Sequence, residues 1–271
     1  MKPNPLARNN VTLAGNPNAE RSIIFVNGIG SEQAVWNSLA EAFSGQNRLV
    51  FFDHVGSVPA NFECFVGNQV RYMNAGGYAQ DLLDICASLR LPGKTVLVGH
   101  SLGAIVSVLA AVKSPEQFEK LILIGASPRY LDDTEYRGGF KQEDIEAIYQ
   151  AMGSDYLSWT RIFASAAAGE DSREAARCLA ESLARIPKEM MLTVLCSILQ
   201  ADHRQVLSEL QVPTLIIHSA HDYFVPLSVA EYLQAHIAGS ELRVIDAKGH
   251  LPHVTDVEKL IEVMRAFIGV C

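Results

Sequence analysis

The sequence predicts an α/β domain whose mostly parallel, doubly wound sheet is interrupted by a helical insertion. Two observations lead to this prediction. Short apolar runs alternate with stretches of helical periodicity before residue 128 and again after residue 213, which is typical of parallel strands joined by helical crossovers. Between them, residues 129–208 contain several helical stretches and no convincing strand. We therefore expect a core formed by residues 1–128 and 209–271, with a helical lid at residues 129–208.

Each strand expected in the first half is a short run rich in β-branched or large apolar residues. These strands are expected at residues 10–15, 22–26, 48–52, 95–98 and 120–124. Helices are expected at residues 32–43 and 78–89 and directly after Ser101, because their apolar residues recur at helical spacing. Residues 58–77 are irregular and contain Pro59, Gly67 and Gly76, so we expect a loop there.

The second half begins with the insertion and then returns to alternating strands and helices. Helical periodicity in the insertion is found around residues 145–152, 156–167, 173–183 and 188–200. After it, we expect strands at residues 214–218 and 242–245 and helices at residues 227–236 and 254–268. The alternation after the insertion predicts that these strands join the same parallel sheet.

The composition narrows the possible partners and compartment. Apolar residues make up 49% of the 271 residues and charged residues 19%, which indicates a globular chain. The net charge is −8 and there is no basic stripe, so we expect no nucleic-acid partner. The N-terminus lacks the apolar segment of a signal peptide, and no apolar run reaches the roughly 18 residues of a membrane span. We expect a cytoplasmic protein without membrane association.

The cysteines agree with that compartment. There are five, an odd number, scattered without a C-x-x-C pair. They are Cys64, Cys86, Cys178, Cys196 and Cys271. We interpret them as reduced thiols.

The strand at residues 95–98 passes into a helix through Gly99-His100-Ser101-Leu102-Gly103, which fits the pattern G-x-S-x-G of a nucleophile elbow. Reversing a strand into a helix within about one residue strains the backbone at the serine. Glycine at positions 99 and 103 avoids Cβ clashes between the crossing segments. A lone serine between glycines is usually a turn residue, but this setting favours Ser101 as a nucleophile. The N–H of Leu102, at the start of the helix, can then face an oxyanion.

A serine hydroxyl needs a general base and a group that orients the base. In an open α/β sheet, these partners are expected just beyond the carboxyl ends of later strands. Asp222 follows the strand at 214–218, and His250 follows the strand at 242–245. The order Ser, Asp, His along the chain suits this fold. We predict a triad of Ser101, His250 and Asp222.

Other residues compete for these roles. Asp246 competes with Asp222, but we expect it in the loop that delivers the histidine, in a capping role. His253 competes with His250, but it follows Pro252 at the start of a helix, where a structural role is expected. His218 and His221 with Asp222 match no closed zinc site, so we expect no metal and no cofactor.

The loop Asn27-Gly28-Ile29-Gly30 follows the strand at 22–26. A second oxyanion donor is expected at this place, and the amide of Ile29 is the candidate. An ordinary glycine turn explains the same four residues equally well.

Several longer stretches resemble a known family. They are 27–30 with Val35 and Trp36, 52–57, 77–81, 99–103, 127–130, 138–140, 201–204 and 249–253. Together they span nearly the whole chain, and Gly138-Gly139-Phe140 and the Gly-His-x-Pro-His run at 249–253 are more specific than the elbow. The chain resembles the α/β-hydrolases and, more narrowly, the RsbQ-type bacterial regulators, whose plant relatives are the karrikin and strigolactone receptors.

The resemblance implies a helical lid over a deep apolar pocket with the triad at its floor. It places Trp159 and Phe163 at the pocket wall; plain packing inside the lid is the alternative, because aromatics at helical spacing usually pack. It also implies a serine hydrolase, of the carboxylic ester class, that acts on a small apolar ester or lactone. A signalling role is implied too, with a metal-dependent serine/threonine phosphatase as partner in stress-sigma-factor control. Two other interpretations stay open: a stand-alone metabolic or detoxifying carboxylesterase, and a slow-turnover ligand-binding regulator.

The chain departs from these relatives at three places. Many hydrolases begin the oxyanion loop with His-Gly, and here it is Asn27-Gly28, so the loop needs a different supporting hydrogen bond. Ile29 stands where relatives usually carry Phe, which reshapes the pocket floor. After Ser57 the sequence continues with Val and Pro instead of Gly and a polar run, so we expect an altered surface or pocket rim there.

Overall fold

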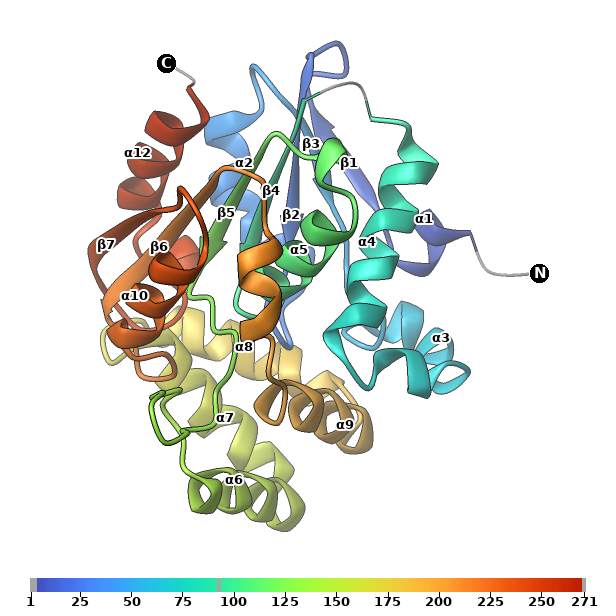
Figure 1. Cartoon of the computed structure of the whole chain (residues 1–271). Coiled ribbons are helices and arrows are strands. Elements are labelled where there is room, and N and C mark those ends of the chain that lie inside the picture. Colours follow the sequence, from blue (N-terminus) through green and yellow to red (C-terminus); the bar gives the residue numbers. More distant parts are fainter. Residues whose placement is uncertain (1–3, 92–93, 270–271) are drawn as a thin grey trace.

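The computed structural model describes residues 4–91 and 94–269 and contains a seven-stranded sheet in the order β1-β3-β2-β4-β5-β6-β7 (Figure 1). The strands are β1 (Thr12–Gly15), β2 (Arg21–Val26), β3 (Arg48–Phe51), β4 (Lys94–His100), β5 (Lys120–Ile124), β6 (Thr214–His221) and β7 (Glu241–Lys248). Only β1 pairs antiparallel, with β3; the other pairs are parallel. The predicted fold class is thereby confirmed. β4, which leads into Ser101, lies between β2 and β5.

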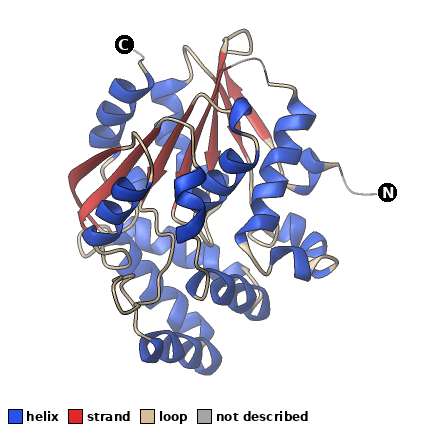
Figure 2. Cartoon of the chain, viewed as in Figure 1, coloured by secondary structure: helices blue, strands red, loops and turns tan. Residues whose placement is uncertain are grey.

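Helices cover both faces of the sheet (Figure 2). In the core, the α-helices are α1 (Pro5–Arg8), α2 (Asn37–Phe43), α3 (Phe62–Val66), α4 (Ala75–Leu89), α5 (Leu102–Lys113), α10 (Leu227–His236), α11 (Pro252–Thr255) and α12 (Val257–Ile268). Four more lie between β5 and β6: α6 (Gln142–Ser154), α7 (Tyr156–Ala168), α8 (Arg173–Arg185) and α9 (Lys188–Leu199). We call α6–α9 the insertion helices. They gather at one end of the sheet (Figure 1).

Two apolar clusters hold the layers together. On one face, Leu39 and Phe43 of α2 and Met264 of α12 pack against the sheet. On the other face, a larger cluster includes Leu82 of α4 and Leu233 of α10, together with side chains of the insertion helices. Fully burying one such side chain contributes about 1.5–3 kcal/mol relative to leaving it exposed. The sheet is therefore fixed between helices, and its carboxyl edge is a rigid place for functional groups.

Residues 58–77, expected to form a loop, are mostly helical. They contain the 3₁₀ turns η2 (Pro59–Asn61) and η3 (Gln69–Tyr72), the five-residue α3, and the beginning of α4 at Ala75. Phe65 and Tyr72 are buried with their ring centroids 5.6 Å apart. Helical pieces this short do not complete two turns, so they leave no periodic signal, and the prediction of a loop was wrong.

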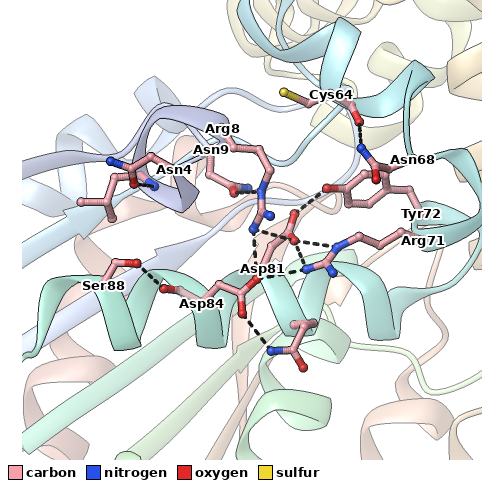
Figure 3. A network of polar contacts seen from close by, with 12 residues as sticks. Asn4, Arg8, Asn9, Cys64, Asn68, Arg71, Tyr72, Asp81, Asp84 and Ser88 are labelled. Atoms are coloured by element: carbon pink, nitrogen blue, oxygen red, sulfur yellow. Dashed lines mark hydrogen bonds and ion pairs between the residues drawn. The ribbon is translucent and has the colours of Figure 1, made fainter. Parts of the chain in front are cut away.

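A polar network attaches residues 58–77 to the core (Figure 3). Its centre is Asp81 of α4, whose side chain is buried. One Asp81 oxygen lies 2.8 Å from Arg8 Nη2 and accepts a hydrogen bond from Arg71 Nε at 3.0 Å. The other accepts a bond from Tyr72 Oη at 3.0 Å. Since removing one member of a buried ion pair leaves an uncompensated charge, this network ties α1 and η3 firmly to α4.

The C-terminal elements differ from the prediction in two respects. β6 and β7 each run beyond the expected strand end, to His221 and Lys248. The single helix expected at residues 254–268 is divided into α11 and α12 by Asp256, whose φ of −135° and ψ of 46° are not helical. The longer strands bring their carboxyl ends closer to Asp222 and His250 along the chain.

Cys64, Cys86, Cys178 and Cys196 are free thiols, and Cys271 lies outside the described residues. None of the helices in residues 4–91 and 94–269 is both long and apolar enough to cross a membrane.

Candidate functional site

Ser101 sits at the sharp turn between β4 and α5, with φ 53° and ψ −116°. A side-chain-bearing residue rarely adopts this region, and such strain is typical of functional turns. The turn is possible because two glycines flank it. A Cβ at Gly99 would lie 2.4 Å from the carbonyl oxygen of Gly103, and one at Gly103 would lie 2.1 Å from that of Val26. The backbone therefore has the form expected of a nucleophile elbow.

His250 and Asp222 meet beyond the ends of β7 and β6. His250 Nδ1 lies 2.7 Å from Asp222 Oδ2, and the two side chains are 6% and 1% exposed. Burial opposes ionisation of Asp222. The attraction to His250 in its protonated form, the hydrogen bond from His250 and the Phe224 amide outweigh burial and hold the pKa of Asp222 below its ordinary value. A buried carboxylate thus holds the Nδ1–H tautomer of His250 and leaves Nε2 to take a proton.

The competing residues lie elsewhere. Asp246 was expected in a loop, and this expectation was wrong. It lies inside β7, where its side chain is exposed. His253 is fully buried in α11, 4.6 Å from the Trp36 ring by centroids, and burial lowers its pKa to about 3. His218 is buried while His221, three residues later, is exposed. In the part of the chain that the structure describes, no three His, Cys, Asp or Glu side chains are grouped to hold a metal ion.

The Ser101 hydroxyl faces a residue that the sequence did not single out. Tyr130 Oη lies 3.4 Å from Ser101 Oγ. Burial raises the pKa of Tyr130 to about 12, so its hydroxyl stays protonated and can donate a hydrogen bond. The hydrogen bonds among the described residues do not join Ser101 Oγ to His250, although both side chains line one cavity. In unliganded enzymes such catalytic bonds are often long and shorten in the substrate complex.

The amides of Leu102 and Ile29 are the predicted oxyanion donors. Leu102 opens α5, where the first N–H groups have no acceptor within the helix. Ile29 follows Gly28, at which a Cβ would lie 2.5 Å from His100 Nδ1, so only glycine lets this loop approach the elbow so closely. Asn27 supports the loop with two buried hydrogen bonds: its Oδ1 accepts from Trp36 Nε1 at 2.6 Å, and its Nδ2 donates to the Phe52 carbonyl at 3.1 Å.

A cavity of about 380 Å³ lies over Ser101, between the sheet edge and the insertion helices. Trp159 and Phe163 of α7 both line it, as does Ile29. Leu102 does not line it; this residue lines two smaller hollows beside the cavity. Besides Ser101 and His250, the polar residues that line it are Ser31, His100 and Tyr130. Most other lining groups are apolar.

The insertion helices also hold the histidine directly. The His250 amide N–H donates to the carbonyl oxygen of Ala167, near the end of α7, at 2.6 Å. The preceding amide, of Gly249, donates to the carbonyl of His221 at 2.8 Å. The loop that carries His250 is therefore hydrogen-bonded both to β6 of the core and to α7.

Residues 23–263 match the model of the alpha/beta hydrolase family, which is most of the chain. The chain belongs to the alpha/beta hydrolase family.

Its relatives among known proteins include plant esterases and receptors. A probable esterase of Oryza sativa subsp. japonica is 37% identical over 248 residues, 91% of this chain and 90% of its own. A strigolactone esterase of Arabidopsis thaliana is 35% identical, with 94% of each chain covered. Among solved structures, a hydrolase from Oleispira antarctica superposes with a TM-score of 0.92 at 26% identity, over 98% of this chain and 96% of that one.

Sequence reasoning missed three groups in the site of this alpha/beta hydrolase. Tyr130 follows the end of β5 at the same sheet edge as the elbow, so the rule that found Asp222 also applies to it. Phe224 stacks on Phe163 with ring centroids 4.9 Å apart and meets His250 edge-on at 5.5 Å. Its only signal was an aromatic residue two positions after the acid. His100 donates from Nε2 to the His250 carbonyl at 2.7 Å, which no spacing rule predicts.

Proposed function

We propose that this alpha/beta hydrolase is a serine esterase or lactonase acting on small apolar substrates through Ser101, His250 and Asp222. One observation carries the proposal: a strained elbow serine and a carboxylate-held histidine line the same apolar cavity. The esterases among its relatives support this reaction class. We also propose that residues 129–208 act as its lid and that it works in the cytoplasm.

In the proposed reaction, Ser101 Oγ attacks the carbonyl carbon while His250 Nε2 takes the hydroxyl proton. The amides of Ile29 and Leu102 stabilise the oxyanion, since they are preorganised where the negative charge develops. The carbon–oxygen bond to the alcohol then breaks, and His250 returns the proton to the leaving oxygen. A water molecule then attacks the carbonyl carbon of the acyl-enzyme while His250 Nε2 takes one of its protons. The bond from that carbon to Ser101 Oγ breaks, His250 returns the proton to Oγ, and the acid is released.

The cavity sets the expected substrate size. An apolar space of about 380 Å³ gains affinity mainly by area burial, at roughly 25 cal/mol per Å². Charged acyl groups lose their hydration on entry, and neither Lys nor Arg lines the cavity among the described residues to compensate. Short uncharged acyl groups or small lactones therefore suit it, and long chains do not.

Hydrolysis of p-nitrophenyl esters should show this limit. We expect the protein to hydrolyse acetate to butyrate esters and to leave laurate untouched. Trp159→Ala removes one wall, so the rate on octanoate relative to acetate should rise by about tenfold, which is typical of one added hydrophobic contact. Initial rates across the acyl series measure both effects. Leu157→Ala, exposed on the same helix and outside the cavity lining, is the control and should keep the wild-type profile.

A small organophosphate that labels Ser101 in both variants shows that the serine is still reactive. A wild-type preference for long chains, or an unchanged profile in Trp159→Ala, contradicts the proposed closed cavity.

We further propose a signalling role of the RsbQ type, with a metal-dependent serine/threonine phosphatase as partner. Two observations support this role: the sequence resemblance and the receptors among the relatives. Co-elution tests the partner: the hydrolase and the phosphatase of this type from the same genome should leave a size-exclusion column together. Separate elution, with ester hydrolysis intact, would favour a stand-alone carboxylesterase. Tight ligand binding with very slow turnover would favour a ligand-binding regulator.

A further inference from the structure

A second cavity of about 410 Å³ adjoins the catalytic one. It lies between α8 of the insertion and the core segment that carries η1 (Gln33–Trp36) and α2. Ser31, Leu179 and Leu251 line both cavities. These three buried residues lie where the two spaces meet.

One of the three shared residues, Ser31, carries a hydroxyl that could bind a ligand. Ser31 is only 5% exposed, yet none of the side-chain hydrogen bonds among the described residues uses its Oγ. Unlike the enclosed hydroxyls of Ser22 and Ser219, Ser31 Oγ is not fully covered, and Ser31 borders both cavities. Ser31 also stands two residues after Ile29, whose amide is the proposed oxyanion donor. Its hydroxyl can therefore bind a substrate atom close to the reacting carbonyl.

The second cavity is more polar than the first and carries a negative excess. Glu32, Glu174 and Glu181 line it, opposed by Arg185, which pairs with Glu32. Arg177 pairs with Glu174 and Glu181 but lines a separate hollow between α7 and α8. The lining itself therefore has three carboxylates and one guanidinium group, which disfavours a bound anion.

The position of His250 indicates which part of an ester would enter the second cavity. His250 must protonate the leaving oxygen, so the alcohol departs on the histidine side of the carbonyl. Leu251, the next residue, belongs to the shared wall. We propose that the second cavity is the subsite for the leaving alcohol and that it selects polar alcohols that are neutral or positively charged. This proposal rests on the proposed esterase function.

A butyrate series with one acyl group and different alcohols tests the subsite: methyl butyrate, 2-hydroxyethyl butyrate, butyrylcholine and 2-sulfoethyl butyrate. Acid release in a pH-stat gives kcat/KM for each ester. We expect the hydroxyethyl and choline esters to exceed the anionic sulfoethyl ester by about tenfold or more. Ala175→Trp fills the second cavity from α8, and Ser38→Trp fills it from α2. Each should lower kcat/KM for the choline ester relative to methyl butyrate by about tenfold.

The matched control is Ala176→Trp, on the same helix but lining the separate hollow between α7 and α8; its ratio should equal that of the wild type. Ser38 is exposed, so Ser38→Trp still tests the subsite where Ala175→Trp does not fold. The proposed subsite is wrong if Ala175→Trp and Ser38→Trp both keep the wild-type ratio of kcat/KM for the choline ester to kcat/KM for methyl butyrate. The proposed esterase function still stands in that case, provided that the wild type hydrolyses methyl butyrate. If the wild type hydrolyses none of the four esters, the proposed esterase function fails with it.

Discussion

Replacing Ser101 with alanine is expected to lower the rate of ester hydrolysis by about 10⁶-fold, the size of effect found when the nucleophile of a complete triad is removed. The physical reason is that Ser101 is placed both at the strained elbow and in the cavity lining with His250. Alanine leaves the oxyanion amides and the cavity in place, so only residual catalysis remains. Initial rates on p-nitrophenyl acetate measure the loss, and circular dichroism melting confirms that the variant folds.

Ser88→Ala is the matched control for this experiment. Ser88 is exposed on α4, and its hydroxyl donates to the Asp84 carbonyl at 2.7 Å, so the rate of this variant should equal that of the wild type. We also expect EDTA to leave the wild-type rate unchanged. An active Ser101→Ala protein, or activity that EDTA abolishes, rules out the assigned nucleophile.

Asp222→Asn is expected to lower turnover by up to about 10⁴-fold while the protein stays folded. The amide cannot stabilise the imidazolium that forms during the reaction, and its NH₂ group facing Nδ1 favours the wrong tautomer of His250. The 2.7 Å contact between Asp222 and His250 makes this substitution a direct test of the orienting role. The measurement is kcat on p-nitrophenyl butyrate.

Asp246→Asn serves as the comparison, because Asp246 is an exposed acid on the strand that leads to His250. It should change turnover little. Should Asp246→Asn prove the damaging substitution and Asp222→Asn the harmless one, the acid has been assigned to the wrong strand.

The catalytic residues were predicted from the positions of the strand ends, and this explains which residues of the site could be found from the sequence. Apolar runs locate strands well, and parallel strands bring their carboxyl ends to one edge. Ser101, Asp222 and His250 could therefore be chosen together from the sequence. Tyr130 follows the end of β5 and was within reach of the same rule, but the rule does not show which residue of that loop faces Ser101; the 3.4 Å contact does.

Polar strands and short helices were also hard to predict. β7 extends through Asp246, beyond the predicted end, and lies at the edge of the sheet with most of its side chains exposed. An exposed edge strand lacks the continuous apolar run of a buried one. Conversely, α3 is too short for helical periodicity to emerge, although Phe65 anchors it in the core. The second cavity was not predictable, since it depends on how α8 lies against residues far away in the sequence.

The bond from the His250 amide to the Ala167 carbonyl links the insertion to the general base. A movement of α7 away from the core removes that acceptor, and a buried amide left without one costs about 1–3 kcal/mol. That penalty amounts to roughly a 5- to 150-fold shift between two conformations. By thermodynamic linkage, any ligand that favours the docked position of α7 also favours the ordered position of His250, and the reverse holds equally.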